Sequence, residues 1–286
     1  MKSVTSESFA KVNLFLELLG KRDDGFWEIE TIFQTISLSD ILTFEVTEKD
    51  TVSLTCSWKE LENEENLVVK AAQLLRKTGK VQKGVKISLK KYIPLGAGLG
   101  GGSSNAALTL KVLNKLWEIN IPEEELHKIA SLLGSDVPFF LTGGTCLGRG
   151  RGEIIKSLET LPPWEIFLIF FPFLVYTKNV YACACLPKTH FSSESMQNAI
   201  KTKDKEGVSA NLFNRLEEIV FREYPEVKIC REELYSLGFK SSLMSGSGPT
   251  LFGFLSTPKD IKKIKEWAGR KGLRCELFQL QPVHGQ

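Results

Sequence analysis

The sequence feature that most constrains the fold is a glycine-rich stretch at residues 94–105, where five glycines fall within seven consecutive positions. Upstream of it, Val85, Ile87 and Leu89 alternate with polar residues, which is the period of a half-buried strand. Downstream, apolar side chains in residues 106–116 recur at helical spacing. The sequence therefore predicts a strand, a glycine loop and an amphipathic helix in succession.

This arrangement predicts an anion site. The first N–H groups of a helix have no partner within the helix and lie at the positive end of its dipole. Glycines let the backbone adopt positive φ and approach an anion closely. Ser103, Ser104 and Asn105 occupy the positions where we expect the helix N-cap. A flexible linker is the alternative, but a linker need not join a strand to a capped helix.

Three known phosphate-binding patterns can be compared with this loop. The P-loop requires a lysine after its last glycine, whereas Gly102 is followed by Ser103. The dinucleotide pattern is matched by Gly96, Gly98 and Gly101, but the acidic residue at the right distance follows a helix rather than a strand. The protein-kinase signatures H-R-D and D-F-G are absent from the sequence. None of the three patterns is met in full.

Length and charge give broad limits. The 286 residues are enough for two domains with sizeable cores, and we place the boundary near Glu153, which gives segments 1–153 and 154–286. The formal net charge is only +3, so the composition does not indicate a nucleic-acid-binding surface.

The cysteines and histidines show no metal-binding spacing. We interpret the six cysteines as reduced core residues, and His127, His190 and His284 have no partner at zinc or triad spacing. No apolar run follows the N-terminus, and the most apolar run, residues 164–174, is too short to span a bilayer. We therefore expect a cytoplasmic protein with no membrane partner.

The first predicted strand places two polar side chains together. Val12, Leu14 and Leu16 alternate with polar and aromatic residues, so Lys11 and Asn13 lie on the same face. A half-solvated strand is the alternative interpretation of this pattern.

Asp136 follows a predicted helix that begins at Pro122 and ends at Gly134. Pro138 cannot continue a helix and disfavours a helical conformation in the residue before it, so we expect a rigid break. An aspartate among apolar residues is rarely unpaired. It is either a functional carboxylate or a capping aspartate.

The remaining patterns predict further elements. They are strands at 29–38 and 42–46 around Ser39 and Asp40, a strand at 52–58, a helix at 67–78, a glycine-rich hairpin at 143–152, a buried strand within 164–171, a glycine turn at 243–253, a last helix at 259–269 and a last strand at 273–280.

Three stretches of the chain, residues 10–14, 94–107 and 243–253, resemble the three motifs of the GHMP kinases in their family order. The extra glycine of the second stretch is similar to one branch, whose acceptor is 4-diphosphocytidyl-2-C-methyl-D-erythritol of the non-mevalonate isoprenoid pathway. The resemblance implies an α+β, two-lobed fold with a ribosomal S5-like N-terminal domain and a ferredoxin-like C-terminal domain.

The segment after the first strand resembles this branch incompletely. The branch has Arg-x-Asp-Gly-Tyr-His, and the chain keeps Arg22, Asp24 and Gly25. Phe26 replaces the tyrosine, and Trp27 replaces the histidine. An indole donates a hydrogen bond but accepts none, so Trp27 cannot accept from the exocyclic amine of cytosine. An alternative is that Trp27 lies in a core.

Three other positions are assigned by the same resemblance. Tyr181 is the closest match to the branch's cytosine-stacking aromatic, and Asn66 matches an asparagine near the adenine, although a plain N-cap explains Asn66 equally well. Residues 214–217 resemble a family Asn-Asp-Leu-Glu segment with Arg215 in place of the aspartate, and we assign this segment a structural role.

The implied reaction transfers the ATP γ-phosphate to the 2-hydroxyl of the acceptor, with ATP as donor and Mg²⁺ as its counter-ion. Asp136 would take the hydroxyl proton, and Lys11 would stabilise the alkoxide and keep Asp136 ionised. The partners would be small molecules, and the protein would be a monomer or weak homodimer. The implied ATP-binding residues are Asn66, Pro94, Leu95, Gly96, Ala97, Gly98, Leu99, Gly100, Gly101, Gly102, Ser103 and Ser104. The implied acceptor-binding residues are Asn13, Phe26, Trp27, Asp136 and Tyr181.

Two alternatives remain at this point. Another GHMP kinase, of the homoserine or mevalonate type, would share the loop but not the Arg-x-Asp-Gly segment or the triple glycine. A non-catalytic nucleotide-binding protein of the same fold would be indicated by loss of Lys11 or Asp136, and both are present.

Overall fold

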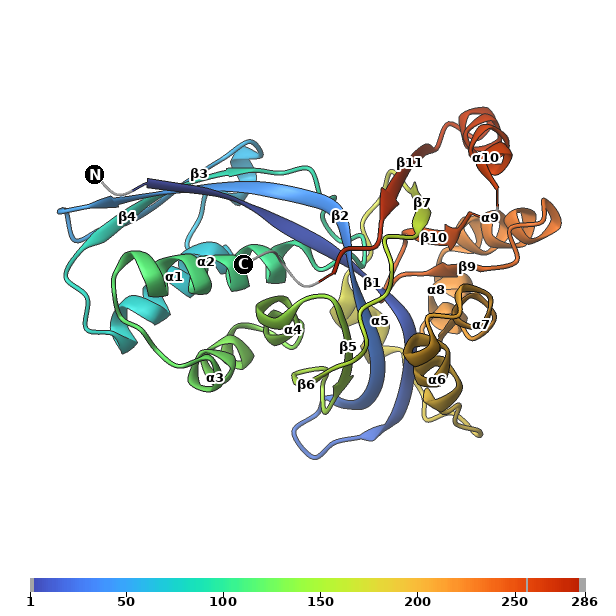
Figure 1. Cartoon of the computed structure of the whole chain (residues 1–286), viewed down its shortest axis with the longest axis horizontal. Helices are drawn as coiled ribbons and strands as arrows, with labels where there is room; N and C mark the ends of the chain where they lie inside the picture. Colours follow the sequence, from blue (N-terminus) through green and yellow to red (C-terminus); the bar gives the residue numbers. More distant parts are fainter. Residues whose placement is uncertain (1–2, 256, 283–286) are drawn as a thin grey trace. The chain divides into compact units, whose positions relative to one another are not determined.

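Helices and strands are mixed along the chain (Figure 1), and the computed structural model describes residues 3–255 and 257–282. In chain order the elements are β1 (Ser3–Lys21), β2 (Trp27–Thr47), β3 (Val52–Cys56), a 3-10 turn (Lys59–Leu61), α1 (Leu67–Thr78), β4 (Gly84–Lys90), α2 (Gly101–Leu116), α3 (Glu123–Leu133), α4 (Val137–Thr142), β5 (Thr145–Arg149), β6 (Ile154–Ser157), β7 (Glu165–Phe170), α5 (Thr177–Ala182), α6 (Glu194–Thr202), α7 (Lys205–Ala210), β8 (Phe213–Asn214), α8 (Glu217–Glu223), α9 (Pro225–Ser236), β9 (Ser242–Met244), β10 (Leu251–Phe254), α10 (Pro258–Arg270) and β11 (Arg274–Gln279). The α+β class is confirmed.

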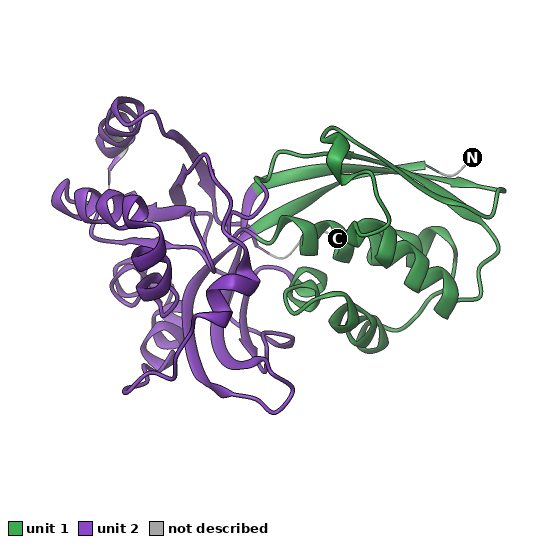
Figure 2. Ribbon diagram, turned by 180° about the vertical axis from the view of Figure 1, so that it is seen from behind, with its two compact units in different colours: residues 1–10, 38–94, 100–142 green, residues 11–37, 95–99, 143–286 purple. Residues whose placement is uncertain are grey.

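The chain forms two compact units that interleave along the sequence (Figure 2). Unit 1 comprises residues 1–10, 38–94 and 100–142, and unit 2 comprises residues 11–37, 95–99 and 143–286. The long strands β1 and β2 contribute to both units, which is why one cut near residue 153 does not describe them. The segments 1–153 and 154–286 therefore remain a prediction about family domains rather than about compact units.

Unit 1 is a sheet with helices on one face (Figure 1). Its strand order is β3-β4-β2-β1, with β4 antiparallel to β2 and parallel to β3. Helices α1 and α2 contact each other, α3 contacts both of them, and α4 contacts α2 and α3. The predicted periodicity agrees with the observed burial. The apolar side chains that alternate along β4, and those at helical spacing in α2, are the ones that are buried.

Unit 2 contains a four-stranded antiparallel sheet in the order β11-β7-β10-β9. The hairpin of β5 and β6 pairs with β2, and β8 pairs in parallel with β1. The core of unit 2 joins strands β7, β9 and β10 to helices α5, α8, α9 and α10 through one cluster of apolar side chains that includes Phe167, Leu251 and Trp267. The predicted hairpin is confirmed, although its second strand, β6, lies beyond the predicted end at residue 152, and the buried strand after Trp164 is confirmed as β7.

Several boundaries differ from the sequence-based expectation, and each difference has a local cause. The strands predicted on either side of Ser39 and Asp40 are one strand, β2, because Asp40 is fully buried and hydrogen-bonded instead of turning the chain. The helix after the glycine loop begins at Gly101 with Gly100 as N-cap, so Ser103, Ser104 and Asn105 lie inside α2. The N-cap prediction for these three residues was wrong.

Two further expectations are corrected. Pro138 lies in the first turn of the short helix α4 rather than in an extended segment. Proline is tolerated there because the N–H groups of the first turn have no partner within the helix. Among the cysteines, Cys146 and Cys230 are buried, but Cys183 and Cys185 are exposed and are not core residues. The predicted helix at 67–78 is confirmed as α1.

Candidate active site

The glycine loop adopts a conformation that only glycines tolerate well. Gly96, Gly98 and Gly100 have φ of 56°, 73° and 70°, in the left-handed region. Gly100 is the N-cap of α2 and has no side chain to occupy the first N–H groups. Gly102, in the first turn, is exposed, and a Cβ added there would meet only Leu67 Cδ1, at 3.8 Å. The start of α2 thus presents backbone donors to an open surface.

Within unit 2, residues 95–99 are held by close backbone contact with the third glycine motif. A Cβ on Gly98 would lie 2.0 Å from the carbonyl oxygen of Ser245 and 2.9 Å from the nitrogen of Gly248. The Ser245 hydroxyl donates to the Gly98 carbonyl at 3.0 Å, and the Val175 N–H donates to the Gly96 carbonyl at 3.1 Å. The close approach of the Ser245 backbone therefore requires a glycine at position 98.

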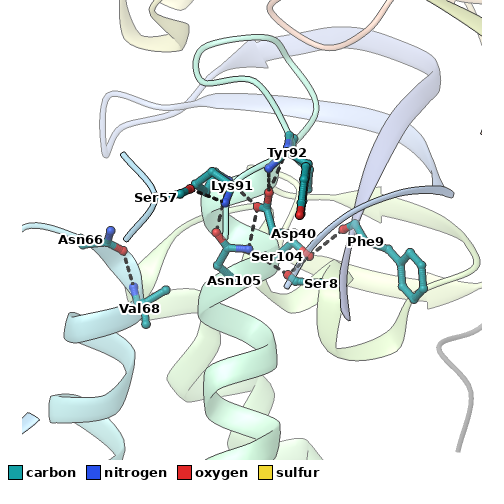
Figure 3. Close-up of polar contacts among 11 residues, drawn as sticks. Ser8, Phe9, Asp40, Ser57, Asn66, Val68, Lys91, Tyr92, Ser104 and Asn105 are labelled. Atoms are coloured by element: carbon teal, nitrogen blue, oxygen red, sulfur yellow. Dashed lines mark hydrogen bonds and ion pairs between the residues drawn. The ribbon is translucent and has the colours of Figure 1, made fainter. Parts of the chain in front are cut away.

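Within unit 1, the other end of the loop rests on a buried charged network (Figure 3). Asp40 is 0% exposed, and its Oδ2 contacts the Lys91 ammonium and accepts from Asn105 Nδ2 at 2.9 Å. Its Oδ1 accepts from the backbone N–H groups of Tyr92 and Ile93, at 2.7 and 2.9 Å. The carboxylate therefore fixes both the chain entering the loop and the first turns of α2.

The same network continues to β1 through hydroxyl groups (Figure 3). Asn105 Nδ2 donates to Ser8 Oγ at 3.0 Å, and Ser8 Oγ lies 2.7 Å from Ser104 Oγ. The Ser104 hydroxyl also donates to the Phe9 carbonyl at 2.6 Å. The Ser104 side chain is thus used inside the protein, and its backbone N–H donates to the Gly100 carbonyl at 2.9 Å, so Ser104 holds the first turn of α2 in place.

Sequence reasoning missed Asp40 and Lys91. A signal was present, because Asp40 falls at the period-two positions of the buried residues Leu38, Leu42 and Phe44 on one strand. An acidic residue in such a position requires a buried partner.

The predicted pairing of Lys11 and Asn13 on one face of β1 is confirmed. Lys11 is 3% exposed, and its ammonium contacts Asn13 Oδ1. Asn13 Nδ2 donates to Thr31 Oγ1 at 2.8 Å, and the Thr31 hydroxyl donates to the Phe15 carbonyl at 2.7 Å. The Lys11 ammonium also lies 5.6 Å from the Phe33 ring centroid. The half-solvated alternative is excluded, and a buried cation is held in a defined position.

Asp136 belongs to unit 1, in the break between α3 and α4 that the sequence predicted. It is only partly buried, whereas Val137 and Phe139 after it are buried. Asp136 as a whole is therefore partly accessible to solvent and directly precedes residues that are packed in the core.

The aromatic residues assigned to acceptor binding lie in unit 2 and differ in exposure. Phe26 is 48% exposed, and the Arg151 guanidinium lies 4.6 Å from its ring centroid. Trp27 is 8% exposed, and its indole N–H donates to the Tyr181 carbonyl at 3.0 Å. Trp27 and Tyr181 are thus brought together, but Trp27 uses its only donor within the protein, as expected if it lies in the core.

Asn66 is fully engaged in local hydrogen bonds. Its Oδ1 accepts from the Val68 N–H at 3.0 Å, which caps α1 (Figure 3), and its Nδ2 donates to the Leu61 carbonyl at 2.9 Å. The plain N-cap interpretation accounts for Oδ1, and the Leu61 carbonyl occupies the other end of the amide.

Neither a metal site nor a spanning helix is seen in the described part of the chain. No group of three or more His, Cys, Asp or Glu side chains within residues 3–255 and 257–282 could hold a metal ion. His284 lies outside these residues. The described helices include none that is long and apolar enough to cross a membrane.

Comparison with known families matches both halves of the chain. The model described as "GHMP kinases N terminal domain" matches residues 66–144, and the model described as "GHMP kinases C terminal" matches residues 196–272. A 4-diphosphocytidyl-2-C-methyl-D-erythritol kinase from Pelotomaculum thermopropionicum is 42% identical over 270 residues, which are 93% of this chain and 93% of the relative. The enzyme of the same name from Geobacillus kaustophilus is 38% identical and covers 95% of this chain, with 94% of its own length matched.

Solved structures agree with these relatives. A crystal structure of 4-(cytidine 5'-diphospho)-2C-methyl-D-erythritol kinase matches 99% of this chain and 100% of its own, with 34% identity and a TM-score of 0.81. A homoserine kinase from Cytophaga hutchinsonii, 19% identical, shares the fold with a TM-score of 0.76 over 99% of this chain and 96% of its own. The chain therefore belongs to the GHMP kinase family, and within it to the group of 4-diphosphocytidyl-2-C-methyl-D-erythritol kinases.

Proposed function

We propose that this protein transfers the γ-phosphate of ATP to the tertiary 2-hydroxyl of 4-diphosphocytidyl-2-C-methyl-D-erythritol, giving the 2-phosphate and ADP. The observation that supports it most is the glycine loop, in which three left-handed glycines lead into the uncapped N-terminus of α2. Such a terminus binds phosphate through backbone N–H groups and the helix dipole.

In this proposal the backbone of residues 96–104 holds the β- and γ-phosphates of ATP, with Pro94 and Leu95 leading into the loop. Transfer of a phosphoryl group requires positioning and charge stabilisation more than covalent chemistry. Lys11 meets this need, because a buried ammonium fixed by Asn13 does not reorganise as charge develops on the acceptor oxygen. Asn13 would also contact the acceptor.

Asp136 would accept the proton of the acceptor hydroxyl. Its partial exposure and its rigid position before α4 suit a general base, which must be reached by the substrate. Magnesium would enter with ATP, because Mg²⁺ is usually held by substrate phosphates and only one or two carboxylates, and it would neutralise phosphate charge.

Recognition of the cytidyl group would depend on stacking by Phe26 and Tyr181. Stacking needs only a ring face, so the Phe26 side chain can replace a tyrosine. The indole N–H of Trp27 is already used by the Tyr181 carbonyl, so we assign Trp27 the role of fixing Tyr181 rather than reading the base edge. Backbone groups near Gly25 would then recognise the polar edge of cytosine.

Asn66 would contribute to the ATP site by fixing the start of α1 beside the adenine, since both ends of its amide are occupied locally. We further propose that the enzyme acts in the cytoplasm as a monomer or weak homodimer, in the pathway to isoprenoid precursors.

An ADP-coupled assay with three acceptors tests this function. The cytidyl substrate should be turned over with ATP, whereas homoserine and mevalonate should not, and mass spectrometry should show one added phosphoryl group. Phosphorus NMR should place that group on the 2-oxygen. Turnover of homoserine or mevalonate instead would show a different GHMP kinase, and absence of turnover with nucleotide binding would show a non-catalytic protein.

A further inference from the structure

The segment of residues 214–217, at the start of α8, does more than connect secondary structures. Asn214 belongs to β8, which pairs in parallel with β1 at Phe15 and Leu16. The Arg215 N–H donates to the Leu16 carbonyl at 2.8 Å, which extends this pairing by one residue. The position of Asn214 is therefore fixed relative to the strand that contains Lys11.

Asn214 is 3% exposed and uses its whole amide. Its Nδ2 donates to the carbonyls of Met244 and Gly246, at 2.7 and 2.8 Å, and its Oδ1 accepts from the Leu216 N–H at 3.0 Å. Two carbonyls of the third glycine motif, on either side of Ser245, are thus held by a single side chain.

The turn that Asn214 holds lies directly against the proposed catalytic lysine. Gly246 has φ of 53°, and a Cβ there would lie 3.0 Å from Lys11 Nζ and 3.1 Å from Asn13 Oδ1. The same Cβ would be 3.1 Å from the Gly98 carbonyl. Any shift of this turn would therefore move the surroundings of both the Lys11 ammonium and the glycine loop.

We propose that Asn214 is a positioning residue for phosphoryl transfer, which acts by fixing the turn at 244–246 against Lys11 and Gly98. The proposal rests on the function proposed above for Lys11. It replaces the purely structural role that the sequence suggested for residues 214–217.

The chemistry of the amide makes this role specific. Two carbonyl oxygens require two N–H donors, and the asparagine side chain supplies both from one nitrogen. A carboxylate of the same shape has no donor when ionised and would repel both carbonyls, whereas a protonated carboxyl would restore one of the two hydrogen bonds. Asn214→Asp should therefore be more active at low pH than at high pH.

The test measures kcat, KM for ATP and thermal stability of the full-length protein for Asn214→Asp and Asn214→Ala, between about pH 5.5 and 8.5. We expect kcat to fall by about 10²-fold for both variants near neutral pH, the cost of misplacing a reacting group by about 1 Å. Relative to wild type, Asn214→Asp should recover activity as the pH falls, and Asn214→Ala should not.

Asn114→Asp is the matched control. Asn114 also bridges a backbone donor and acceptor, with Nδ2 donating to the Ile121 carbonyl at 3.0 Å and Oδ1 accepting from the Ile121 N–H at 2.9 Å, but it touches neither glycine motif. Its substitution should lower the melting temperature without the change in pH profile. The same pH profile in Asn114→Asp, or wild-type kcat in a folded Asn214→Ala, would overturn the proposal.

Hydrogen exchange gives a readout that does not depend on the substrate. Peptides that span residues 243–250 and 95–99 should lose protection in Asn214→Ala, while peptides from α1 should not change. This result is expected even if the wild-type enzyme fails to phosphorylate the cytidyl acceptor, so failure of the proposed function and failure of this inference can be told apart. Unchanged exchange at 243–250 would show that Asn214 does not fix the turn.

Discussion

The glycine loop is supported in two different ways at its two ends. In unit 1, the chain before the loop and the first turns of α2 rest on the buried charges of Asp40 and Lys91. In unit 2, residues 95–99 rest on Ser245 through backbone contact, with hydrogen bonds between neutral groups.

The difference determines which substitutions each end can tolerate. Replacing both members of a buried ion pair by apolar side chains of similar volume is tolerated better than removing one charge. When one charge is removed, the other ion stays buried without a partner and without its hydration. Backbone packing tolerates changes in charge nearby but not added volume, since the carbonyl of Ser245 leaves no room for a Cβ at Gly98. Substitutions at the two ends of the loop should therefore have different effects on stability and on catalysis.

The largest effect is expected for the chemistry itself. Asp136→Asn should keep ATP binding and lower kcat by about 10²- to 10⁴-fold, the usual contribution of a positioned general base. Single-turnover kinetics would measure it. The matched control is Asp204→Asn, because Asp204 is a helix cap that accepts from the Glu206 N–H at 3.1 Å. Equal and small effects in both variants would mean that Asp136 is only a cap.

Removing one charge of the unit 1 network should be the most destabilising change. Asp40→Asn leaves the Lys91 ammonium buried without its counter-charge, so unfolding free energy should fall by about 3–5 kcal/mol. Adding Lys91→Met should recover part of the loss. Asp50→Asn, which breaks the partly exposed pair with Arg76, should cost less than about 1 kcal/mol. Denaturant titration would measure these free energies of unfolding. If Asp40→Asn were no more destabilising than Asp50→Asn, the buried ion pair would not be a main support of unit 1.

Two glycine substitutions distinguish a glycine that is required by backbone packing from one that allows ATP to approach the backbone. Gly98→Ala should lower the free energy of unfolding by about 1–3 kcal/mol, because the added Cβ overlaps the Ser245 carbonyl. Gly102→Ala should leave stability within about 0.5 kcal/mol of wild type but raise KM for ATP, since the surface there is open. If KM for ATP is unchanged in Gly102→Ala, the phosphates do not approach the backbone at this residue.

The unit 2 support contains one group that should respond to pH. Burial raises the pKa of Glu217 to about 7, although its Oε1 accepts from the Met244 N–H at 2.8 Å and lies 3.9 Å from Arg231 Nε. A carboxyl whose pKa is raised on folding stabilises the protein at low pH, and this stabilisation is lost as pH rises through about 7.

Glu217→Gln removes this titration and keeps the acceptor oxygen. Its melting temperature relative to wild type should therefore rise between about pH 4.5 and 7, by the equivalent of about 1–3 kcal/mol. Calorimetry across this range would measure the difference, and a constant difference would show that Glu217 does not titrate there.

The smallest effect is expected in the acceptor pocket. Phe26→Ala should raise KM for the cytidyl acceptor by roughly 2- to 10-fold, the worth of an aromatic stack. Trp27→Phe should raise that KM less than Phe26→Ala does and lower stability by about 1 kcal/mol, since it removes the hydrogen bond to the Tyr181 carbonyl without removing a stacking ring. If Phe26→Ala has no effect and neither CMP nor UMP competes, the pocket does not bind cytosine.

Much of the fold followed from local patterns. The period-two alternation gave β4, and the asparagine cap with helical spacing gave α1 from Leu67 to Thr78. The helix start in the glycine loop was placed too late, because the usual preference for Ser or Asn caps was overridden by Gly100 in a left-handed conformation.

The sequence by itself determined the glycine loop, the shared face of Lys11 and Asn13, and the family to which the chain belongs, because these depend on residue type and short spacing. Only the tertiary structure revealed that Asp40 pairs with Lys91, 51 residues later in the chain, and so supports the loop. It also revealed that Asn214 holds a turn about 30 residues further along the chain. Such contacts depend on which strands and turns meet after folding. A polar residue in an apolar pattern shows that a partner must exist, but the fold alone decides which one.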